Sequence, residues 1–350
     1  MTTHAEQTLR GLTEIAEAIE VKSESAFRFR DRTVSVDRSL PPSKRHPYYH
    51  PDPLLLQLHL AIYTSFFACV RSGGSASTMP ATAPVAATNN NETDEMIRLL
   101  NEANRSQRGW DEGWTVQFAL STGHVVATKD TRVQQFQPGQ FVNDAGPRLP
   151  KAGDQIHAIR HRASSGLQPG FHFIFGEAIG DFQDQFNLVR FYWNIGWEGA
   201  APLVRAAATL LNRCQLPFRL KCPVTRQGFG RVDPVVCYAA TRHGHVMMEL
   251  IRRIHPEVSP FLRDPTPLFT KRLAAGLAWA ENPAPGKSFG AHRCLIVAEG
   301  LVAAWKQGAG TAAARLDRIQ QQFLARGLSP ERPYLSRAGR DPYGLTELEL

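Results

Sequence analysis

The sequence predicts an α+β fold, in which a mixed or antiparallel sheet is flanked by helices and preceded by an N-terminal helical region. Three observations lead to this class: an amphipathic pattern at the start of the chain, short strand patterns clustered between residues 109 and 195, and alanine- and leucine-rich segments after residue 200. Strands that cluster without alternating strictly with helices favour an α+β body over a doubly wound parallel sheet.

The first 92 residues are predicted to contain two helices and a linker. Apolar side chains recur at helical spacing in residues 5–20, and residues 54–70 form a second, more buried helical pattern. Small residues, proline and asparagine dominate residues 72–91, which indicates a flexible linker or long loop. Thr93 is the expected N-cap of the next helix. We therefore divide the chain into an N-terminal helical region, a linker or loop, and an α+β body, at residues 1–71, 72–92 and 93–350.

The body is expected to begin as a sheet and to continue with helices among further strands. Apolar and β-branched runs bounded by turn residues predict strands at residues 114–120, 124–128, 170–176, 187–195, 217–222 and 234–240. Alanine, leucine and helical periodicity predict helices at residues 201–214, 246–255, 288–305 and 315–327.

Charge and cysteine usage limit the function classes. The net charge is +8, and only eight of the 40 basic side chains are lysines. A lysine within a motif is therefore a candidate functional residue. An anionic partner is indicated. The arginines are scattered and no reader motif occurs, so nucleic acid is not the expected partner. Five widely spaced cysteines predict neither a disulfide framework nor a zinc site, and favour a reducing cytoplasm.

Several established motifs are absent from the sequence. The N-terminus carries charges where a signal peptide would be apolar, and polar residues interrupt the stretch 54–70, so we expect a soluble cytoplasmic protein without membrane contact. No phosphate loop, complete dinucleotide loop, G-x-S-x-G elbow or H-E-x-x-H pair occurs. ATP, NAD and a catalytic metal are therefore not expected.

Two strand patterns place polar groups on one complete face of an apolar run. In residues 188–195, Arg190 and Tyr192 share a face, and in residues 217–222, Arg219 and Lys221 do so. Two interpretations remain open. The strands are half-exposed with solvated polar faces, or both polar faces line one cleft.

The second interpretation has chemical consequences. Arg219 and Lys221 would project side by side, roughly 7 Å apart by strand rise, and the guanidinium would disfavour a protonated lysine. A neutral lysine can remove a carbon-bound proton. Arginine does not give up its proton, so Arg190 and Arg219 suit a phosphate or carboxylate clamp, and Tyr192 can donate a proton or hydrogen bond.

Three later segments are rich in polar residues, namely GFGRVDPVVCY, PLFTKRL and GKSFGAHRC. The last lies near the predicted start of a helix, which is a favourable place for an oxyanion. Ordinary structural roles remain open for each: a surface ion pair, an exposed basic pair, and a core or surface histidine. The candidate residues are Arg231, Lys271, His292 and Arg293.

In sequence order, the segments VRFYWN, LNRCQLPFRLKC, GRVDPVVCYAA, PLFTKRLAAGLAWAE and SFGAHRCLIVAEGL resemble the HopA-type family, named after a type III secretion effector. The resemblance covers roughly residues 109–301. It implies a phosphothreonine or phosphoserine lyase that works with a separately encoded kinase on a ribosomally made precursor peptide, as in class V lanthipeptide or thioamitide pathways. Elimination of phosphate would leave dehydrobutyrine or dehydroalanine.

A weaker resemblance, to the phosphothreonine lyase effectors of enteric bacteria, implies roles for single residues. Their Lys-x-His pair corresponds here to Arg190-x-Tyr192, and their lysine base to Lys221, which follows 29 positions after Tyr192. Tyr192 stands where those proteins have a histidine acid, so His292 competes as the acid. The reaction implied needs no metal or cofactor. The residues expected to hold the phosphate are Arg190, Arg219, Arg231, Lys271 and Arg293.

One alternative function is compatible with the same fold but involves no catalysis. The chain would then be a non-catalytic adaptor for a phosphopeptide or leader peptide, or a host-directed type III effector. The N-terminal helices and linker suit a docking module for kinase or leader under either interpretation.

Overall fold

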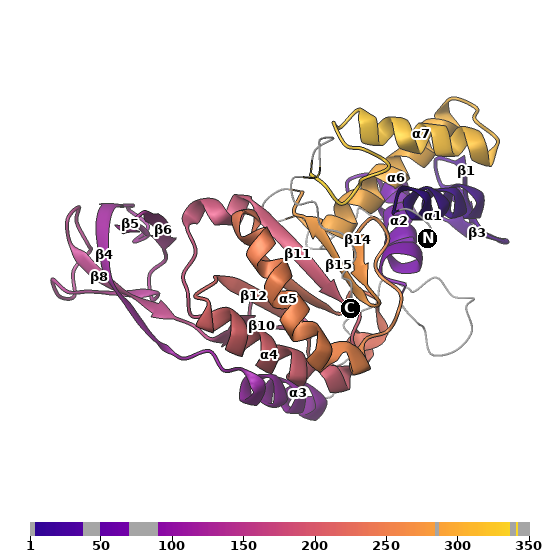
Figure 1. Cartoon of the computed structure of the whole chain (residues 1–350). Coiled ribbons are helices and arrows are strands. Elements are labelled where there is room, and N and C mark those ends of the chain that lie inside the picture. The colour runs from indigo at the N-terminus through magenta and orange to yellow at the C-terminus, as the bar shows by residue number, and fades with distance from the viewer. Residues whose placement is uncertain (1–3, 38–49, 70–89, 284–286, 337–340, 342–350) are drawn as a thin grey trace.

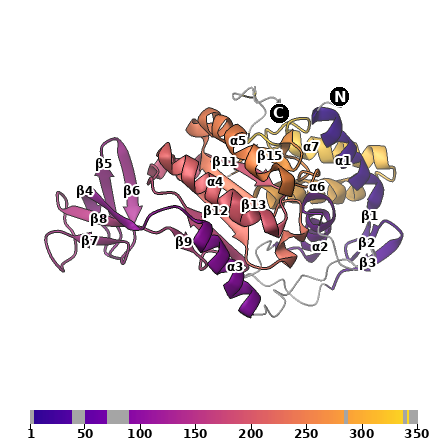
Figure 2. The same cartoon turned by 60° about the horizontal axis from the view of Figure 1, so that its bottom comes forward.

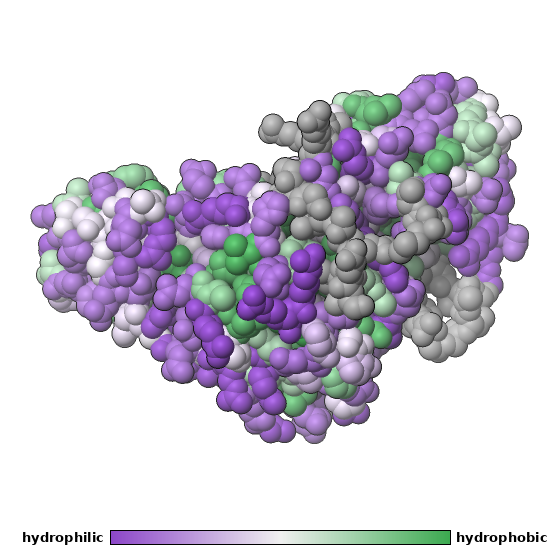
Figure 3. Space-filling model, in the orientation of Figure 1, coloured by the Kyte–Doolittle hydropathy of each residue, from purple (hydrophilic) through white to green (hydrophobic). Residues whose placement is uncertain are grey.

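The structure is a computed structural model that describes residues 4–37, 50–69, 90–283, 287–336 and 341 (Figure 1). Within these ranges it contains seven α-helices and three antiparallel sheets, which confirms the predicted α+β class. No helix in the described part of the chain is both long and apolar enough to cross a bilayer. The molecular face in Figure 3 is predominantly hydrophilic, with separate hydrophobic areas.

The N-terminal region combines helices with a small sheet that the sequence pattern did not indicate. Helix α1 (His4–Ala18) packs against α7 (Ala312–Leu324), and α2 (Pro53–Ile62) packs against α6 (Phe289–Lys306). The predicted second helix ends in a π-helical turn, Tyr63–Phe67. The small antiparallel sheet contains strands β1 (Ile19–Ser23), β2 (Ala26–Phe29) and β3 (Arg32–Ser35).

The next helix, α3 (Asn90–Ala103), begins three residues before the predicted N-cap. The prediction of Thr93 as N-cap was therefore wrong, because Thr93 lies within the first turn of the helix. Glu92 lies in the same turn, where its negative charge interacts favourably with the positive end of the helix dipole. Most of the predicted linker, residues 72–89, lies outside the described residues, and its last positions, 90–92, belong to α3.

A five-stranded sheet protrudes from the body (Figures 1 and 2). Its strand order is β6-β5-β4-β8-β7, and Trp114 lies at the centre of its own small hydrophobic cluster. Two of these strands match the predicted ones. The five are β4 (Gly109–Ala119), β5 (Val125–Lys129), β6 (Arg132–Phe136), β7 (Phe141–Asn143) and β8 (Gln155–Arg160).

The central sheet has seven strands in the order β14-β15-β11-β13-β12-β10-β9, all antiparallel. Four of them confirm predicted strands. The hairpin of β14 and β15 was not anticipated, because alanine-rich sequence is a poor strand signal. The strands are β9 (Ala163–Ser164), β10 (Phe171–Phe175), β11 (Leu188–Trp193), β12 (Phe218–Pro223), β13 (Val235–Ala240), β14 (Lys271–Ala274) and β15 (Leu277–Glu281).

Helices α4 (Ala200–Arg213) and α5 (Gly244–Val258), both predicted, cover one face of the central sheet (Figure 1). Trp193 and Leu220 of the sheet line one small buried cavity with Leu203 of α4 and Ile251 of α5. Because side chains alternate between the faces of a strand, the residues next to Trp193 and Leu220 point to the opposite face.

Candidate active site

The pairing register brings the polar residues of β11 and β12 to one face of the central sheet. Tyr238 of β13 pairs with Arg190 on one side and with Arg219 on the other. In the next row, Val236 pairs with Tyr192 and with Lys221. Directly opposed residues of antiparallel strands project to the same face, so both polar patterns meet on the face that α4 and α5 do not cover.

Tyr238 is the centre of this arrangement and was missed at the sequence level. The centroid of its ring lies 5.1 Å from the guanidinium carbon of Arg190 and 4.6 Å from that of Arg219. Stacking on an aromatic ring restrains both arginines. The available signal was a tyrosine on the same strand face as Val236 in a run otherwise made of small apolar residues.

Lys221 lies opposite Val236, in the row next to that of Tyr238, and contacts an aromatic ring. Its Nζ atom is 3.7 Å from the centroid of the Phe171 ring. Burial lowers the pKa of Lys221 from 10.5 to about 7; Asp233 opposes this shift, while nearby arginines, including Arg219, add to it. A sizeable neutral fraction therefore exists at neutral pH, and burial, rather than the neighbouring guanidinium, is its main cause.

The two arginines beside Tyr238 differ in their partners. Arg190 donates to Asn282 Oδ1 from Nε at 3.0 Å and again from its terminal nitrogen, which also bonds the Lys287 carbonyl at 2.6 Å. The Nε of Arg219 is buried and has no hydrogen-bond partner among the described residues. Burial also lowers the pKa of Arg219. Arg219 is thus the cation with hydrogen-bonding capacity left for an anion.

Arg231 lies beside this group and is already paired. It binds both carboxylate oxygens of Asp233, at 2.7 and 2.9 Å, and donates to the Tyr63 hydroxyl at 2.7 Å. The Asp233 side chain is only 8% exposed, so this is not a surface ion pair. Tyr63 comes from the π-helical turn after α2, which means that the N-terminal region contacts the candidate site.

Two predicted phosphate-binding residues have their partners in the C-terminal segment. Lys271 pairs with Trp279, whose other neighbour, Phe191, points away from the face of Arg190, and its Nζ binds Asp341 at 2.7 Å. Arg293 is fully buried in α6. It donates to the carbonyl oxygens of Pro333 and Leu335, both at 2.7 Å. These two side chains hold the C-terminal segment in place.

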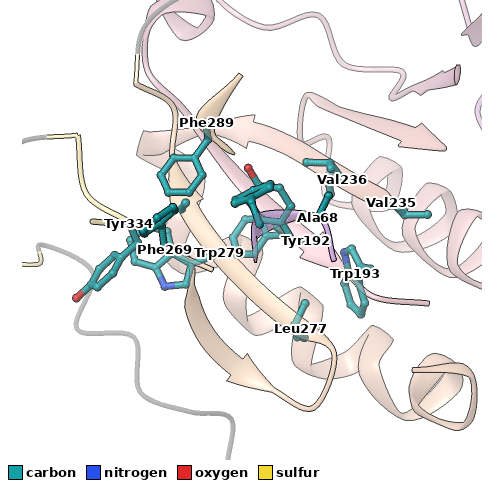
Figure 4. Close-up of a cluster of buried hydrophobic side chains, with 14 of the residues drawn as sticks. Ala68, Tyr192, Trp193, Val235, Val236, Phe269, Leu277, Trp279, Phe289 and Tyr334 are labelled. Carbon is teal, nitrogen blue, oxygen red and sulfur yellow. The ribbon is translucent and has the colours of Figure 1, made fainter. Parts of the chain in front are cut away.

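Of the two predicted acids, Tyr192 shares a sheet row with Lys221 but is buried, and His292 lies in α6. Tyr192 is 2% exposed and packs at a tilt against Phe289, with the ring centroids 6.3 Å apart (Figure 4). It also packs edge-on against Phe67, again with centroids 6.3 Å apart. Its hydroxyl has no hydrogen-bond partner among the described residues, and burial raises its pKa. The Nδ1 of His292 is 2.6 Å from Arg293, and burial with that neighbouring charge lowers the pKa of His292 to about 4.

The described residues offer no group of three or more histidine, cysteine or acidic side chains arranged to hold a metal ion. The positive charge on this face comes instead from arginine and lysine side chains. These side chains can bind a multiply charged anion beside Lys221, which is partly neutral at pH 7.

The structural role of Arg293 leads to a testable expectation. Arg293→Met would leave two buried carbonyl groups without donors, and we expect it to lower the free energy of unfolding by about 3 kcal/mol. Urea unfolding measures the change. Arg253→Met, on the exposed side of α5 and paired only with Glu249, is the matched control and should change stability by less than about 0.5 kcal/mol. Unchanged stability with lost phosphopeptide binding would instead return Arg293 to the binding site.

Comparison with known proteins finds a family match over part of the chain and similar solved structures at low identity. Residues 162–335 match the HopA1 effector protein family. An effector protein from Pseudomonas syringae pv. tomato strain DC3000 is similar in structure at 16% identity, over 96% of this chain and 100% of that one, with a TM-score of 0.46. An effector protein from P. syringae pv. syringae strain 61 shows 13% identity over 95% and 98% of the chains, with a TM-score of 0.45. No curated protein sequence matches the chain.

Proposed function

We propose that this protein, whose residues 162–335 match the HopA1 effector protein family, is a phosphothreonine or phosphoserine lyase. It eliminates phosphate from a precursor peptide that a separate kinase has phosphorylated, and leaves dehydrobutyrine or dehydroalanine during maturation of a lanthipeptide or related product. The observation that carries the proposal is the position of Lys221, with its lowered pKa, beside Arg219 on one face of the sheet.

In this mechanism the neutral Lys221 amine removes the α-proton of the phosphorylated residue. The electron pair forms the Cα–Cβ double bond, and the Cβ–O bond breaks with its electrons on the departing phosphate. Arg219 binds the phosphate through its terminal guanidinium nitrogens, which have no hydrogen-bond partner among the described residues. Arg190, already oriented by Asn282, provides a second positive charge without reorganisation during the reaction.

Arg231 contributes mainly through electrostatics, because Asp233 and Tyr63 already occupy its donors. Lys271 and Arg293 stay outside the phosphate site in this proposal, since each holds the C-terminal segment. The arginines compensate the charge of the leaving dianion, so the proposed reaction needs no metal or cofactor.

The direct test is turnover of a phosphothreonine peptide by the purified full chain. We expect stoichiometric release of inorganic phosphate and a peptide mass lower by one phosphoric acid, unchanged by a chelator. The unphosphorylated peptide is the control and should keep its mass. A precursor phosphorylated by its own kinase that binds without losing phosphate would overturn the lyase assignment.

That outcome would favour the second candidate, a host-directed effector or a non-catalytic phosphopeptide- or leader-binding adaptor. The family description as an effector protein is the observation that supports it. Saturable binding of the phosphopeptide with no dehydro residue in the recovered peptide would distinguish this function from the lyase.

A further inference from the structure

β-Elimination of phosphate is assisted when a proton donor meets the departing oxygen, and neither acid expected from the sequence is available for this. Tyr192 is 2% exposed, its ring packs against Phe67 and Phe289, and its hydroxyl oxygen is buried. The His292 ring bonds Arg293, and no contact among the described residues links it to Lys221. A donor must therefore come from another group on the face of Arg219.

Tyr238 meets the geometric requirements. It is half-buried on the same face as Lys221, and no hydrogen bond within the described residues uses its hydroxyl. Lys221 pairs with Val236, two positions before Tyr238. Residues in such a diagonal relation across antiparallel strands lie roughly 7–8 Å apart at the backbone, so rotation of the long Lys221 side chain from Phe171 toward Tyr238 would place the α-carbon and β-oxygen of one phosphorylated residue between the two groups.

Arg190 and Arg219 are placed to hold a phosphate close to the Tyr238 hydroxyl. The guanidinium groups of Arg190 and Arg219 lie 5.1 and 4.6 Å from the Tyr238 ring centroid. A phosphate held by both would be centred above the tyrosine. Transfer of the phenolic proton to the departing oxygen would then take place beside both positive charges.

We propose that Tyr238 is the general acid of the elimination, which rests on the proposed lyase function. Lys221 Nζ takes the α-proton, the Cα–Cβ double bond forms, and the Cβ–O bond breaks. The Tyr238 O–H bond breaks heterolytically and its proton moves to the departing oxygen, so hydrogen phosphate leaves. An ammonium on Lys221 and a phenolate on Tyr238 remain, and proton exchange with water restores both groups.

The test compares two leaving groups in Tyr238→Phe, which keeps the ring on which both arginines stack. With a phosphoserine peptide we expect about 100-fold slower elimination, the lower range for loss of a general acid. With the matching S-phosphocysteine peptide the leaving group is a thiophosphate, which needs less protonation, and the loss should be under about 5-fold. Both reactions give dehydroalanine, which mass spectrometry measures.

Tyr192→Phe is the matched control and should stay within about 3-fold of the unaltered protein on both peptides. Equal slowing of the two peptides by Tyr238→Phe would reduce Tyr238 to a positioning residue for the arginines, and full activity would remove it from the site; either result overturns the proposal. Absence of elimination by the unaltered protein on both peptides would instead contradict the lyase function itself.

Discussion

Replacement of Lys221 by methionine is expected to lower kcat/KM for phosphopeptide elimination by at least about 10³-fold, because the variant has no group to accept the α-proton. Methionine keeps an unbranched side chain against Phe171 and removes only the amine. Binding of the phosphopeptide should weaken much less than turnover, since Arg190 and Arg219 remain. Phosphate release and peptide affinity, measured separately, give the two values.

The pH profile provides a second readout for the same residue. The base is active when deprotonated, and burial lowers the pKa of Lys221 to about 7, so kcat/KM should rise up to about pH 7 and then level off. Lys221→Arg keeps the charge but provides no base at any of these pH values, and should be as inactive as the methionine variant. An active arginine variant would contradict the assignment of Lys221 as the base.

The stability of the methionine variant distinguishes lost chemistry from lost folding. In the unaltered protein the folded-state pKa of Lys221 lies below its ordinary value of 10.5, so the unfolded chain binds more protons between about pH 7 and pH 10.5. The free energy of unfolding therefore rises with pH across this window, and the cost of burying the lysine is greatest below it. Lys221→Met removes that cost and should unfold at no lower urea concentration at pH 7.

Replacement of Arg219 by alanine is expected to lower kcat/KM by about 10²- to 10³-fold, the range for removal of one donor that stabilises developing charge. No hydrogen bond within the described residues uses the terminal nitrogens of Arg219, so the phosphate is the partner that we assign to them. Added guanidinium ion should restore part of the activity of the alanine variant, since the truncation leaves space for it. Steady-state rates with and without guanidinium provide the measurement.

Arg226→Ala is the matched control for Arg219→Ala. Arg226 also stacks on an aromatic ring, with its guanidinium carbon 4.3 Å from the centroid of Trp197, but it lies outside the candidate site. Its replacement should change kcat/KM by less than about 2-fold. Full activity of Arg219→Ala, or equal losses in both variants, would mean that Arg219 does not bind the phosphate.

The local periodicity of apolar and polar residues was sufficient to predict the fold class and many of the helices and strands. The helical spacing before residue 20 predicted α1, and the alternation in residues 188–195 and 217–222 predicted β11 and β12. That alternation also grouped Arg190 with Tyr192 and Arg219 with Lys221, because a two-residue period determines the face within a single strand. The small N-terminal sheet and the β14–β15 hairpin have weaker local signals and were missed.

The pairing of strands that are distant in sequence could be seen only in the tertiary structure. Tyr238 became a site residue only because β13 pairs with both β11 and β12, and no local period encodes that pairing. Burial likewise removed the Tyr192 hydroxyl from contact with solvent and lowered the pKa of Lys221. Burial is a property of packed neighbours that are distant in sequence, as Tyr63 beside Arg231 also shows.

The sequence by itself determined an α+β chain with two polar strand faces, a scarce lysine on one of them, and a resemblance to the effector family that residues 162–335 match. The tertiary structure decided which charges meet. It grouped Arg190, Arg219 and Lys221 around Tyr238, and directed Lys271 and Arg293 to the C-terminal segment. The physical reason is that side-chain alternation is local, whereas strand register and burial arise only when distant segments pack together.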